Sequence, residues 1–223
     1  MSLMLHFHPL SSFCQKVLIA LYESGTPFTP KLVDLSDANQ RAAFLTLWPI
    51  GKFPVLEDLD KGRVVPESSL IIEFLDQNYP GRNYPGASPF IPHEPAAALE
   101  VRHWDRFFDL NVNEPVQKIV GDRLRPDGQH DPAGVAHARG RLKTACGMLE
   151  TALVDRRWAA GAAFSMADCA AAPALFYADK VMPFGADYPV TSAYVERLRA
   201  RPSYARVLAE AQPYLAMFPQ ARD

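Results

Sequence analysis

The first eighty residues alternate between short apolar runs and stretches in which apolar residues recur at helical spacing. Leu3 to Phe7 predicts a strand that ends before Pro9. Residues 13–21 carry apolar side chains at the spacing of a helix, and Gly25 ends that helix. Residues 28–35 predict a second strand. Because a helix separates the two strands, we expect them to lie parallel in a βαβ unit.

A second unit follows in the order strand, strand, helix. Residues 53–57 and 63–65 predict two strands, and the Asp and Gly residues of the loop at 58–62 predict that they pair as a hairpin. Residues 67–77 predict an amphipathic helix. Its expected inward-facing residues are Leu70, Ile71, Phe74 and Leu75. The βαβ and ββα units together predict a domain over residues 1–80, a mixed sheet covered by helices.

The chain changes character after residue 80. Residues 81–92 are rich in proline and glycine, which is typical of a linker. The rest of the chain has helical periodicity with almost no strand signal, so residues 93–223 predict an all-helical bundle domain. Helices are expected near residues 93–120, 132–156, 166–179, 191–200 and 203–211. The predicted fold class is therefore α/β followed by all-α.

Composition narrows the possible functions. Hydrophobic residues make up 48% of the chain and charged residues 22%, and the formal net charge is -2. These values give no reason to expect nucleic acid or a membrane as partner. No apolar run approaches the roughly 18 to 20 residues that span a bilayer, and we expect no signal peptide. The three cysteines and six histidines form no disulfide or metal-ligand pattern, so we expect a cytoplasmic protein without a metal site.

Ser11 and Ser12 stand where the first strand turns into the first helix. A helix N-terminus presents unpaired N–H groups and a partial positive charge, so it stabilises an anion such as a thiolate. A serine hydroxyl at this place can donate one further hydrogen bond to sulfur. Taken alone, the serine pair is more typical of an ordinary N-cap.

Two further segments carry possible binding chemistry. Pro54 ends a loop and begins a strand, which makes it a candidate for a cis peptide bond. Ser68 stands near the predicted start of the helix at 67–77, where backbone N–H groups can hold a carboxylate. The ordinary alternatives are a simple strand start at Pro54 and a capping serine at Ser68.

Four segments, in this order, resemble the cytosolic glutathione transferase family. Residues 11–21 are similar to the family's catalytic loop and first helix, and residues 51–56, Gly-Lys-Phe-Pro-Val-Leu, to its cis-proline loop. Residues 67–75 resemble its γ-glutamyl site, and residues 161–168 resemble a Gly-x-x-Phe-Ser/Thr-x-Ala-Asp segment of its helical domain. The resemblance covers nearly the whole chain. It implies a thioredoxin-like N-terminal domain, glutathione as co-substrate and a homodimer.

The resemblance also implies site residues. Ser11 takes the position of the hydroxyl that stabilises the glutathione thiolate, and it is the expected catalytic residue. Phe53, before the presumed cis-Pro54, would pair its backbone with the cysteinyl unit of glutathione by strand addition. The γ-glutamyl and glycyl ends are assigned to Glu67, Ser68, Lys52 and Gln40.

A hydrophobic pocket for the second substrate is implied beside the glutathione site. The resemblance assigns it to the loop before Ser11 and to the first long helix of the second domain. Its expected residues are His8, Leu10, Trp104, Phe107 and Phe108. The three aromatic residues would serve equally well as core side chains of an amphipathic helix.

These roles predict a transferase in which the glutathione thiolate attacks an electrophilic carbon of a hydrophobic substrate. One alternative is a glutathione-dependent isomerase or peroxidase, because the loop partly resembles that of zeta-type transferases, which isomerise maleylacetoacetate. Four residues depart from that pattern, namely Phe13, Gln15, Lys16 and Leu18. The other alternative is a non-catalytic glutathione-binding module that carries ligands or docks partner proteins.

Two motifs are interpreted as structural. Cys14 occupies the second position of a C-x-x-C arrangement whose first position is Ser11, so dithiol chemistry is excluded there and Cys14 is expected to be a small buried side chain. Ser165 and Asp168 have the spacing of a helix capping box and are expected to stabilise the helical domain.

Overall fold

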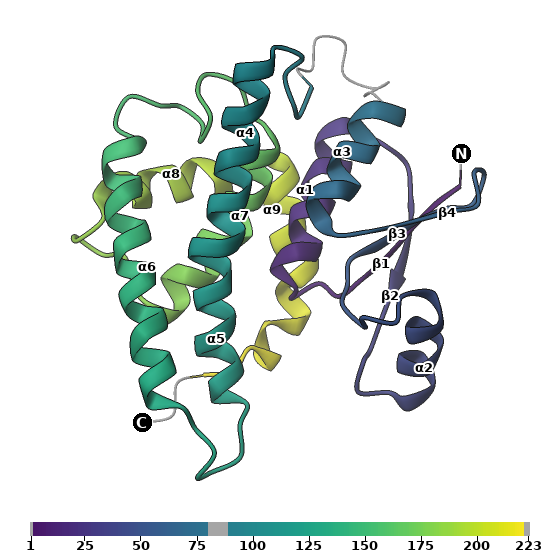
Figure 1. Cartoon of the computed structure of the whole chain (residues 1–223), viewed down its shortest axis with the longest axis horizontal. Helices are drawn as coiled ribbons and strands as arrows, with labels where there is room; N and C mark the ends of the chain where they lie inside the picture. Colours follow the sequence, from purple (N-terminus) through teal and green to yellow (C-terminus); the bar gives the residue numbers. More distant parts are fainter. Residues whose placement is uncertain (1, 80–88, 221–223) are drawn as a thin grey trace.

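A computed structural model describes residues 2–79 and 89–220 (Figure 1). The N-terminal part contains a four-stranded sheet with the order β2-β1-β3-β4. Strands β1 and β2 run parallel, whereas β3 is antiparallel to both β1 and β4. Its elements are β1 (Leu3–Phe7), α1 (Ser12–Ser24), β2 (Thr29–Leu32), α2 (Ala38–Leu47), β3 (Val55–Asp58), β4 (Arg63–Pro66) and α3 (Ser68–Asn78). The predicted βαβ and ββα units are both confirmed.

The alternation of side chains along the strands divides them between two layers. Leu3 and Leu5 of β1 and Leu56 of β3 are almost fully buried in the main core, which also holds α1 and α3. The neighbouring Val55 points to the opposite face and packs against Phe44 of α2. The sheet is therefore covered on both faces, and β1 leads from it directly into the N-terminus of α1.

Two details of this domain differ from the sequence prediction. Helix α2 was not predicted, because Phe44 is its one buried residue and the helix has no continuous apolar stripe. Leu70 of α3 was expected to face inward but is 54% exposed, and the buried residue is Ile72 instead. The inward face of α3 is thus rotated relative to the predicted one.

The helical part begins after the segment at 80–88, so most of the predicted linker at 81–92 lies outside the described residues. The predicted helix at 93–120 is divided into α4 and α5 by a π-helical turn, η1. The elements are α4 (Pro95–Phe107), η1 (Phe108–Asn113), α5 (Glu114–Arg123), α6 (Pro132–Ala152), α7 (Met166–Val181), α8 (Pro189–Arg199), α9 (Pro202–Ala211) and the 3-10 turn η2 (Gln212–Met217). The other predicted helices agree with these bounds to within a few residues.

Helix α7 is the centre of the molecule. It is buried over most of its circumference and packs against α4, η1 and α8 of its own domain and against α1 of the N-terminal domain. Helix α1 also packs against α9, so one helix of the first domain lies against two helices of the second (Figure 1). This packing fixes the N-terminus of α1 between the two domains.

Several expected features of the helical domain are present. The backbone N–H of Ser165 donates to Oδ2 of Asp168 at 2.9 Å, which confirms the capping box. The three cysteines are free and buried. Among the described helices, none is both long and apolar enough to cross a membrane.

Candidate active site at the N-terminus of α1

Ser11 is the N-cap of α1, with φ -73° and ψ 119°. Its Oγ accepts a hydrogen bond from the backbone N–H of Cys14 at 3.3 Å. The capping role therefore exists, but it uses only a lone pair of the hydroxyl, and the hydroxyl proton stays available for donation. The first turn of α1 contains no acidic residue that would repel an anion. The arrangement can hold a negatively charged atom at the helix N-terminus.

The adjacent Ser12 is not available for this chemistry. It is 2% exposed, and its hydroxyl donates to Oδ1 of Asn113 in η1 at 3.0 Å. Ser12 thus connects the two domains, while Ser11 is only partly buried. The family resemblance indicated Ser11 rather than Ser12, and of the two serines only Ser12 is buried and already bonded to the helical domain.

The peptide bond between Phe53 and Pro54 is cis, as predicted. Pro54 is buried, and no residue that the structure describes forms a hydrogen bond with the backbone N–H or C=O of Phe53. These two backbone groups belong to the loop that directly precedes β3. They can pair with an extended ligand in the manner of an added strand.

Glu67 has φ 67° and is the one non-glycine residue with a positive φ among the described residues. A side chain in this conformation costs on the order of 1 to 3 kcal/mol, and such outliers concentrate at functional sites. Glu67 is the N-cap of α3, and its side chain makes no capping hydrogen bond. The first backbone N–H groups of α3, beside the buried Ser68, are therefore free of a side-chain cap and can bind a carboxylate.

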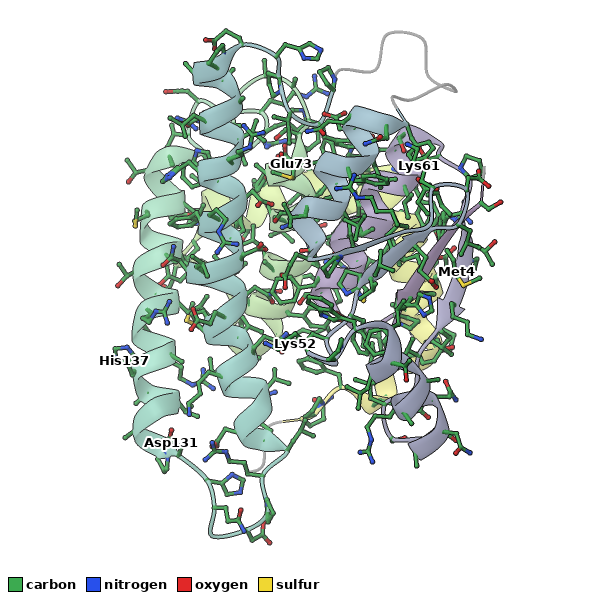
Figure 2. The ribbon with its side chains drawn as sticks, turned by 45° about the vertical axis from the view of Figure 1, so that its right-hand side comes forward. Met4, Lys52, Lys61, Glu73, Asp131 and His137 are labelled. Carbon is green, nitrogen blue, oxygen red and sulfur yellow. The ribbon has the colours of Figure 1, made fainter. Side chains whose placement is uncertain are left out.

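Lys52 is exposed and lies on the side of the N-terminal domain that faces the helical domain (Figure 2). Gln40 lies on α2, and its Oε1 accepts a hydrogen bond from the backbone N–H of Asp34 at 3.1 Å. Within residues 2–79 and 89–220, no ion pair engages the ammonium of Lys52, which belongs to the loop before the cis-proline. The amide of Gln40, by contrast, is directed to a local loop contact.

The imidazole of His8 lies between two aromatic rings. It stacks on Phe53 with a centroid distance of 6.0 Å and meets Tyr214 of η2 edge-on at 5.5 Å. Its Nδ1 accepts a hydrogen bond from the backbone N–H of Leu10 at 3.3 Å. Burial lowers the pKa of His8, although Asp34 acts in the opposite direction. His8 and Leu10 thus lie next to the Ser11 loop, and Tyr214 joins them from a segment that the sequence did not indicate.

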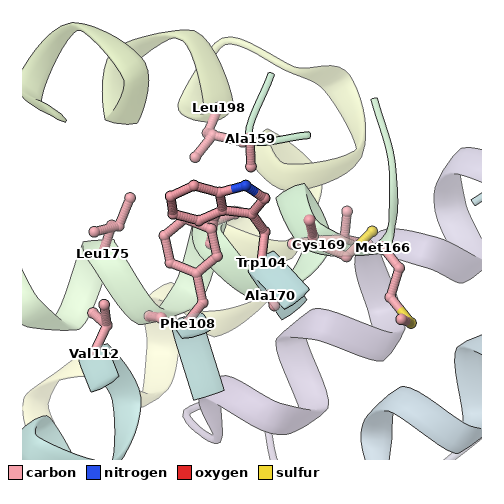
Figure 3. Close-up of a cluster of buried hydrophobic side chains, with 14 of the residues drawn as sticks. Trp104, Phe108, Val112, Ala159, Met166, Cys169, Ala170, Leu175 and Leu198 are labelled. Atoms are coloured by element: carbon pink, nitrogen blue, oxygen red, sulfur yellow. The ribbon is translucent and has the colours of Figure 1, made fainter. Parts of the chain in front are cut away.

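Trp104, Phe107 and Phe108 do not form an open pocket wall. They are 6%, 5% and 0% exposed and pack against one another in the core of the helical domain, where Figure 3 shows Trp104 and Phe108 beside Leu175. The pocket roles expected for these three residues are therefore corrected. The alternative interpretation, a core face of an amphipathic helix, describes them.

A buried ionic network connects the two domains beside the start of α3. The ammonium of Lys16, 1% exposed, lies 2.6 Å from Oδ1 of Asp105 and 2.9 Å from Oδ2 of Asp109. It also donates to Oγ of Ser69 at 2.9 Å, and that hydroxyl donates to Oδ2 of Asp105 at 2.7 Å. Ser69 follows Ser68 in the chain, so the network connects the first turn of α3 to α1 and to the helical domain.

The pKa values within this network follow from burial and charge. Burial alone would lower the pKa of Lys16, but the carboxylates of Asp105 and Asp109 outweigh it and raise that pKa above its ordinary value. Burial raises the pKa of Asp109, and Lys16 counteracts that effect only in part. The lysine therefore stays charged, and its charge is needed to keep two carboxylates in the interior.

A cavity of about 1300 Å³ lies elsewhere, between the C-terminal half of α3 and the start of α4. Its lining includes Glu73, Tyr79, Phe90, Leu99 and Arg201. None of the residues predicted for the site lines it. The candidate site is thus defined by the convergence of α1, the cis-proline loop and α3 rather than by this cavity.

A thioredoxin-like domain with a serine at the N-terminus of its first helix, a cis-proline loop and a helical second domain defines the architecture of a glutathione transferase. The comparisons with known proteins agree. Residues 5–83 match the family described as "Glutathione S-transferase, N-terminal domain", and residues 132–197 match "Glutathione S-transferase, C-terminal domain". The chain belongs to the glutathione S-transferase family.

Individual relatives cover nearly the whole chain. FtsZ-localized protein A of Caulobacter vibrioides is 30% identical over 221 residues, 95% of this chain and 93% of that protein. A glutathione S-transferase from Methylobacillus flagellatus, solved with glutathione bound, has a TM-score of 0.82 and 25% identity and covers 92% of this chain and 98% of its own. One from Methylobacterium radiotolerans, in complex with glutathione sulfonate, has a TM-score of 0.80 and 26% identity and covers 100% of this chain and 97% of its own.

Proposed function

We propose that this protein is an enzyme that binds glutathione and transfers its thiolate to an electrophilic carbon of a hydrophobic substrate. The observation that carries the proposal is the geometry of Ser11, whose hydroxyl caps α1 as an acceptor and keeps its proton for an incoming sulfur. The similar Methylobacillus flagellatus transferase with bound glutathione supports the choice of ligand.

The remaining parts of glutathione have matching partners in this proposal. The backbone of Phe53 pairs with the cysteinyl unit, because its N–H and C=O have no partner among the described residues. Glu67 and Ser68 hold the γ-glutamyl end at the uncapped N-terminus of α3. Lys52 attracts the glycyl carboxylate. Gln40 serves that end only if its amide leaves the contact with Asp34.

Ionisation of the thiol is the central chemical step. A free thiol with a pKa near 8.5 is only a few per cent ionised at about pH 7. Lowering this pKa by about two units requires about 2.7 kcal/mol of preferential stabilisation of the thiolate. A charge-assisted hydrogen bond contributes about 1.5 to 3 kcal/mol, and a helix N-terminus adds about 0.3 to 1 kcal/mol. Ser11 and the α1 terminus together can therefore supply the required energy.

The second substrate lies over the loop of His8 and Leu10, beside Tyr214. With an aryl halide, the sulfur lone pair forms the new C–S bond and the halide leaves with the electron pair of the broken bond. The protein contributes the ionised nucleophile and holds both reactants together, which are the two main sources of rate enhancement in such a reaction.

The test replaces Ser11 by alanine and uses Ser12→Ala as the matched control. With an aryl halide as substrate, Ser11→Ala is expected to lower kcat/KM roughly 10- to 100-fold, because it removes a charge-assisted hydrogen bond. The absorbance of the bound thiolate should also titrate at higher pH. Ser12→Ala should lower the melting temperature through its lost bond to Asn113 without moving the thiol pKa. An unchanged rate in Ser11→Ala would refute the role given to Ser11.

We also propose that the protein works as a cytoplasmic homodimer, with the N-terminal domain of one subunit against the helices of the other. Membership of the family supports this assembly. Sedimentation equilibrium of the purified chain gives the molecular mass directly. A mass of one chain at micromolar concentration would contradict the dimer.

A second candidate function is a non-catalytic module that docks a partner protein. It is favoured by the similarity to FtsZ-localized protein A, whose name describes a location on another protein rather than a reaction. Titration calorimetry with glutathione separates the two functions. A folded protein that binds no glutathione at millimolar concentration would favour the docking module, whereas binding with thiol ionisation would favour the enzyme.

A further inference from the structure

Two side chains hold the carbonyl groups that directly precede Ser11. Nε2 of Gln15 donates to the carbonyl oxygen of Pro9 at 2.8 Å, and the hydroxyl of Tyr177 donates to the carbonyl oxygen of Leu10 at 2.8 Å. Nε2 of Gln15 also donates to the Tyr177 hydroxyl at 3.2 Å. The three hydrogen bonds connect the Ser11 loop, helix α1 and helix α7 of the second domain.

These bonds determine the orientation of the peptide unit between Leu10 and Ser11. Its carbonyl oxygen is held by Tyr177, and its N–H, on Ser11, donates to the carbonyl oxygen of His8 at 3.0 Å. A peptide unit is planar, so two hydrogen bonds at opposite ends fix its plane. The plane places the N and Cα atoms of Ser11, and together with the φ of -73° that Ser11 adopts as the N-cap of α1 it sets the direction in which the side chain leaves the backbone. The Ser11 hydroxyl is thus positioned from the second domain.

The burial of both residues makes the arrangement rigid. Gln15 is 0% exposed and Tyr177 is 3% exposed. Only the NH2 group of an amide can serve two acceptor oxygens, so the orientation of the Gln15 amide follows from its partners. Burial raises the pKa of Tyr177 well above its ordinary value, so its hydroxyl remains a neutral donor throughout the working pH range.

The amide of Gln15 is satisfied on one side only. Its Oε1 is buried and has no partner among the described residues, which costs about 1 to 3 kcal/mol. Its NH2 group is fully used, since a leucine at this position would leave the carbonyl of Pro9 and the hydroxyl of Tyr177 without their donor. The function of the side chain therefore lies in what its NH2 group holds, the carbonyl of Pro9 and the hydroxyl of Tyr177.

We propose that Gln15 and Tyr177 are positioning residues that set the acidity of the bound thiol by fixing the Ser11 hydroxyl. The inference rests on the proposed function, since it concerns the same site. A displacement of about 1 Å in a catalytic group can cost two orders of magnitude in rate. The second domain thus controls the nucleophile as well as the neighbouring substrate.

Tyr204 provides a matched control. It is 1% exposed, and its hydroxyl donates to the carbonyl oxygen of Ala172 on the same helix α7 at 3.1 Å. Tyr204→Phe and Tyr177→Phe therefore delete the same atom and break the same kind of buried hydrogen bond. They differ in that only the Tyr177 hydroxyl contacts the Ser11 loop and its second holding residue, Gln15.

The experiment uses the full chain and three variants, Tyr177→Phe, Gln15→Leu and Tyr204→Phe. For each one, the pKa of bound glutathione is measured from thiolate absorbance, the Kd by calorimetry and the melting temperature by scanning calorimetry. Tyr177→Phe and Gln15→Leu should raise the thiol pKa by about one unit and lower kcat/KM at acidic pH roughly tenfold. Tyr204→Phe should lose a similar amount of thermal stability with the thiol pKa unchanged.

The outcomes separate this inference from the proposed function. A wild-type protein that does not bind glutathione, or binds it without lowering its thiol pKa, refutes the proposed function and with it the inference. A wild-type protein that lowers the thiol pKa while Tyr177→Phe and Gln15→Leu match it refutes the inference alone. If either of these variants is unfolded, the other decides, because Gln15→Leu and Tyr177→Phe disturb different carbonyls of the loop.

Discussion

Replacing Lys16 by methionine removes the cation that lies between Asp105 and Asp109 and keeps the length of the side chain. Little cavity is created, so the loss of stability should be electrostatic. Lys16 is 1% exposed and lies within 3 Å of both carboxylates, at 2.6 and 2.9 Å. Removing one partner of such a buried ion pair costs about 3 to 5 kcal/mol, because a charge is left uncompensated in the interior. We expect a loss of this size in Lys16→Met.

The stability lost in Lys16→Met should depend on pH, in a direction that follows from the pKa of Asp109. Without Lys16, burial raises the pKa of Asp109 further above its ordinary value. The folded variant then binds a proton that the unfolded chain releases, so its stability is greatest at low pH and falls as the pH rises through the raised pKa. The loss relative to the wild type should therefore be larger at pH 8 than at pH 5.

Urea unfolding of wild type and Lys16→Met at both pH values measures the effect. Lys118→Met is the matched control, since Lys118 and its partner Asp131 are both 37% exposed and their charged groups lie 2.5 Å apart. An exposed pair of this kind contributes about 0 to 1 kcal/mol. If Lys16→Met loses no more stability than Lys118→Met, with no difference between the two pH values, the interpretation of the buried network is wrong.

Two further substitutions test residues interpreted as structural. Asp168 is fully buried and accepts hydrogen bonds from the backbone N–H groups of Ala159 and Ser165 and from the hydroxyl of Tyr194. Asp168→Ala should therefore lower the free energy of unfolding by on the order of 3 kcal/mol, as measured by thermal or urea unfolding. Turnover per folded molecule should be unchanged at low temperature, and a lost turnover at intact stability would contradict this. Burial raises the pKa of Cys14 to about 12, so its thiol stays neutral. Cys14→Ala should keep kcat/KM within a few-fold. A near-complete loss of activity would instead show that the Cys14 thiol takes part in the reaction.

The sequence predicted those helices and strands whose own residues show an apolar pattern. Strand β1 has the predicted bounds, because its apolar run is followed two residues later by Pro9. Helix α2 lacks an apolar stripe, yet its start carried a signal, since Asp37 accepts from the backbone N–H of Gln40 at 2.8 Å in the spacing of a capping residue. Apolar periodicity predicted the helices that bury a whole face. It did not predict α2, because that helix buries only the side chain of Phe44.

The candidate site was predictable where chemistry and motif coincide. The cis peptide bond at Pro54 and the capping role of Ser11 were expected, and both are present. The burial of Lys16 was not predictable, because Asp105 and Asp109 lie about ninety residues away in the sequence and no local pattern connects them with Lys16. The contact of Tyr177 with the Ser11 loop escaped prediction for the same reason. Long-range polar partners become visible only when the domains are packed.

The π-helical turn η1 has a consequence for how this protein tolerates change. Positions four apart on an α-helix drift by about 40° around the axis, so three such positions in a row would no longer face the same neighbour. A turn that takes more residues per rotation offsets the drift, and Asp105, Asp109 and Asn113 all meet α1, through Lys16 and Ser12. Substitutions at the exposed Leu110 leave this alignment intact. Insertion or deletion of a single residue between 108 and 113 would instead rotate α5 relative to α6 and α7, on which it packs, so the length of this segment is constrained as strictly as its buried residues.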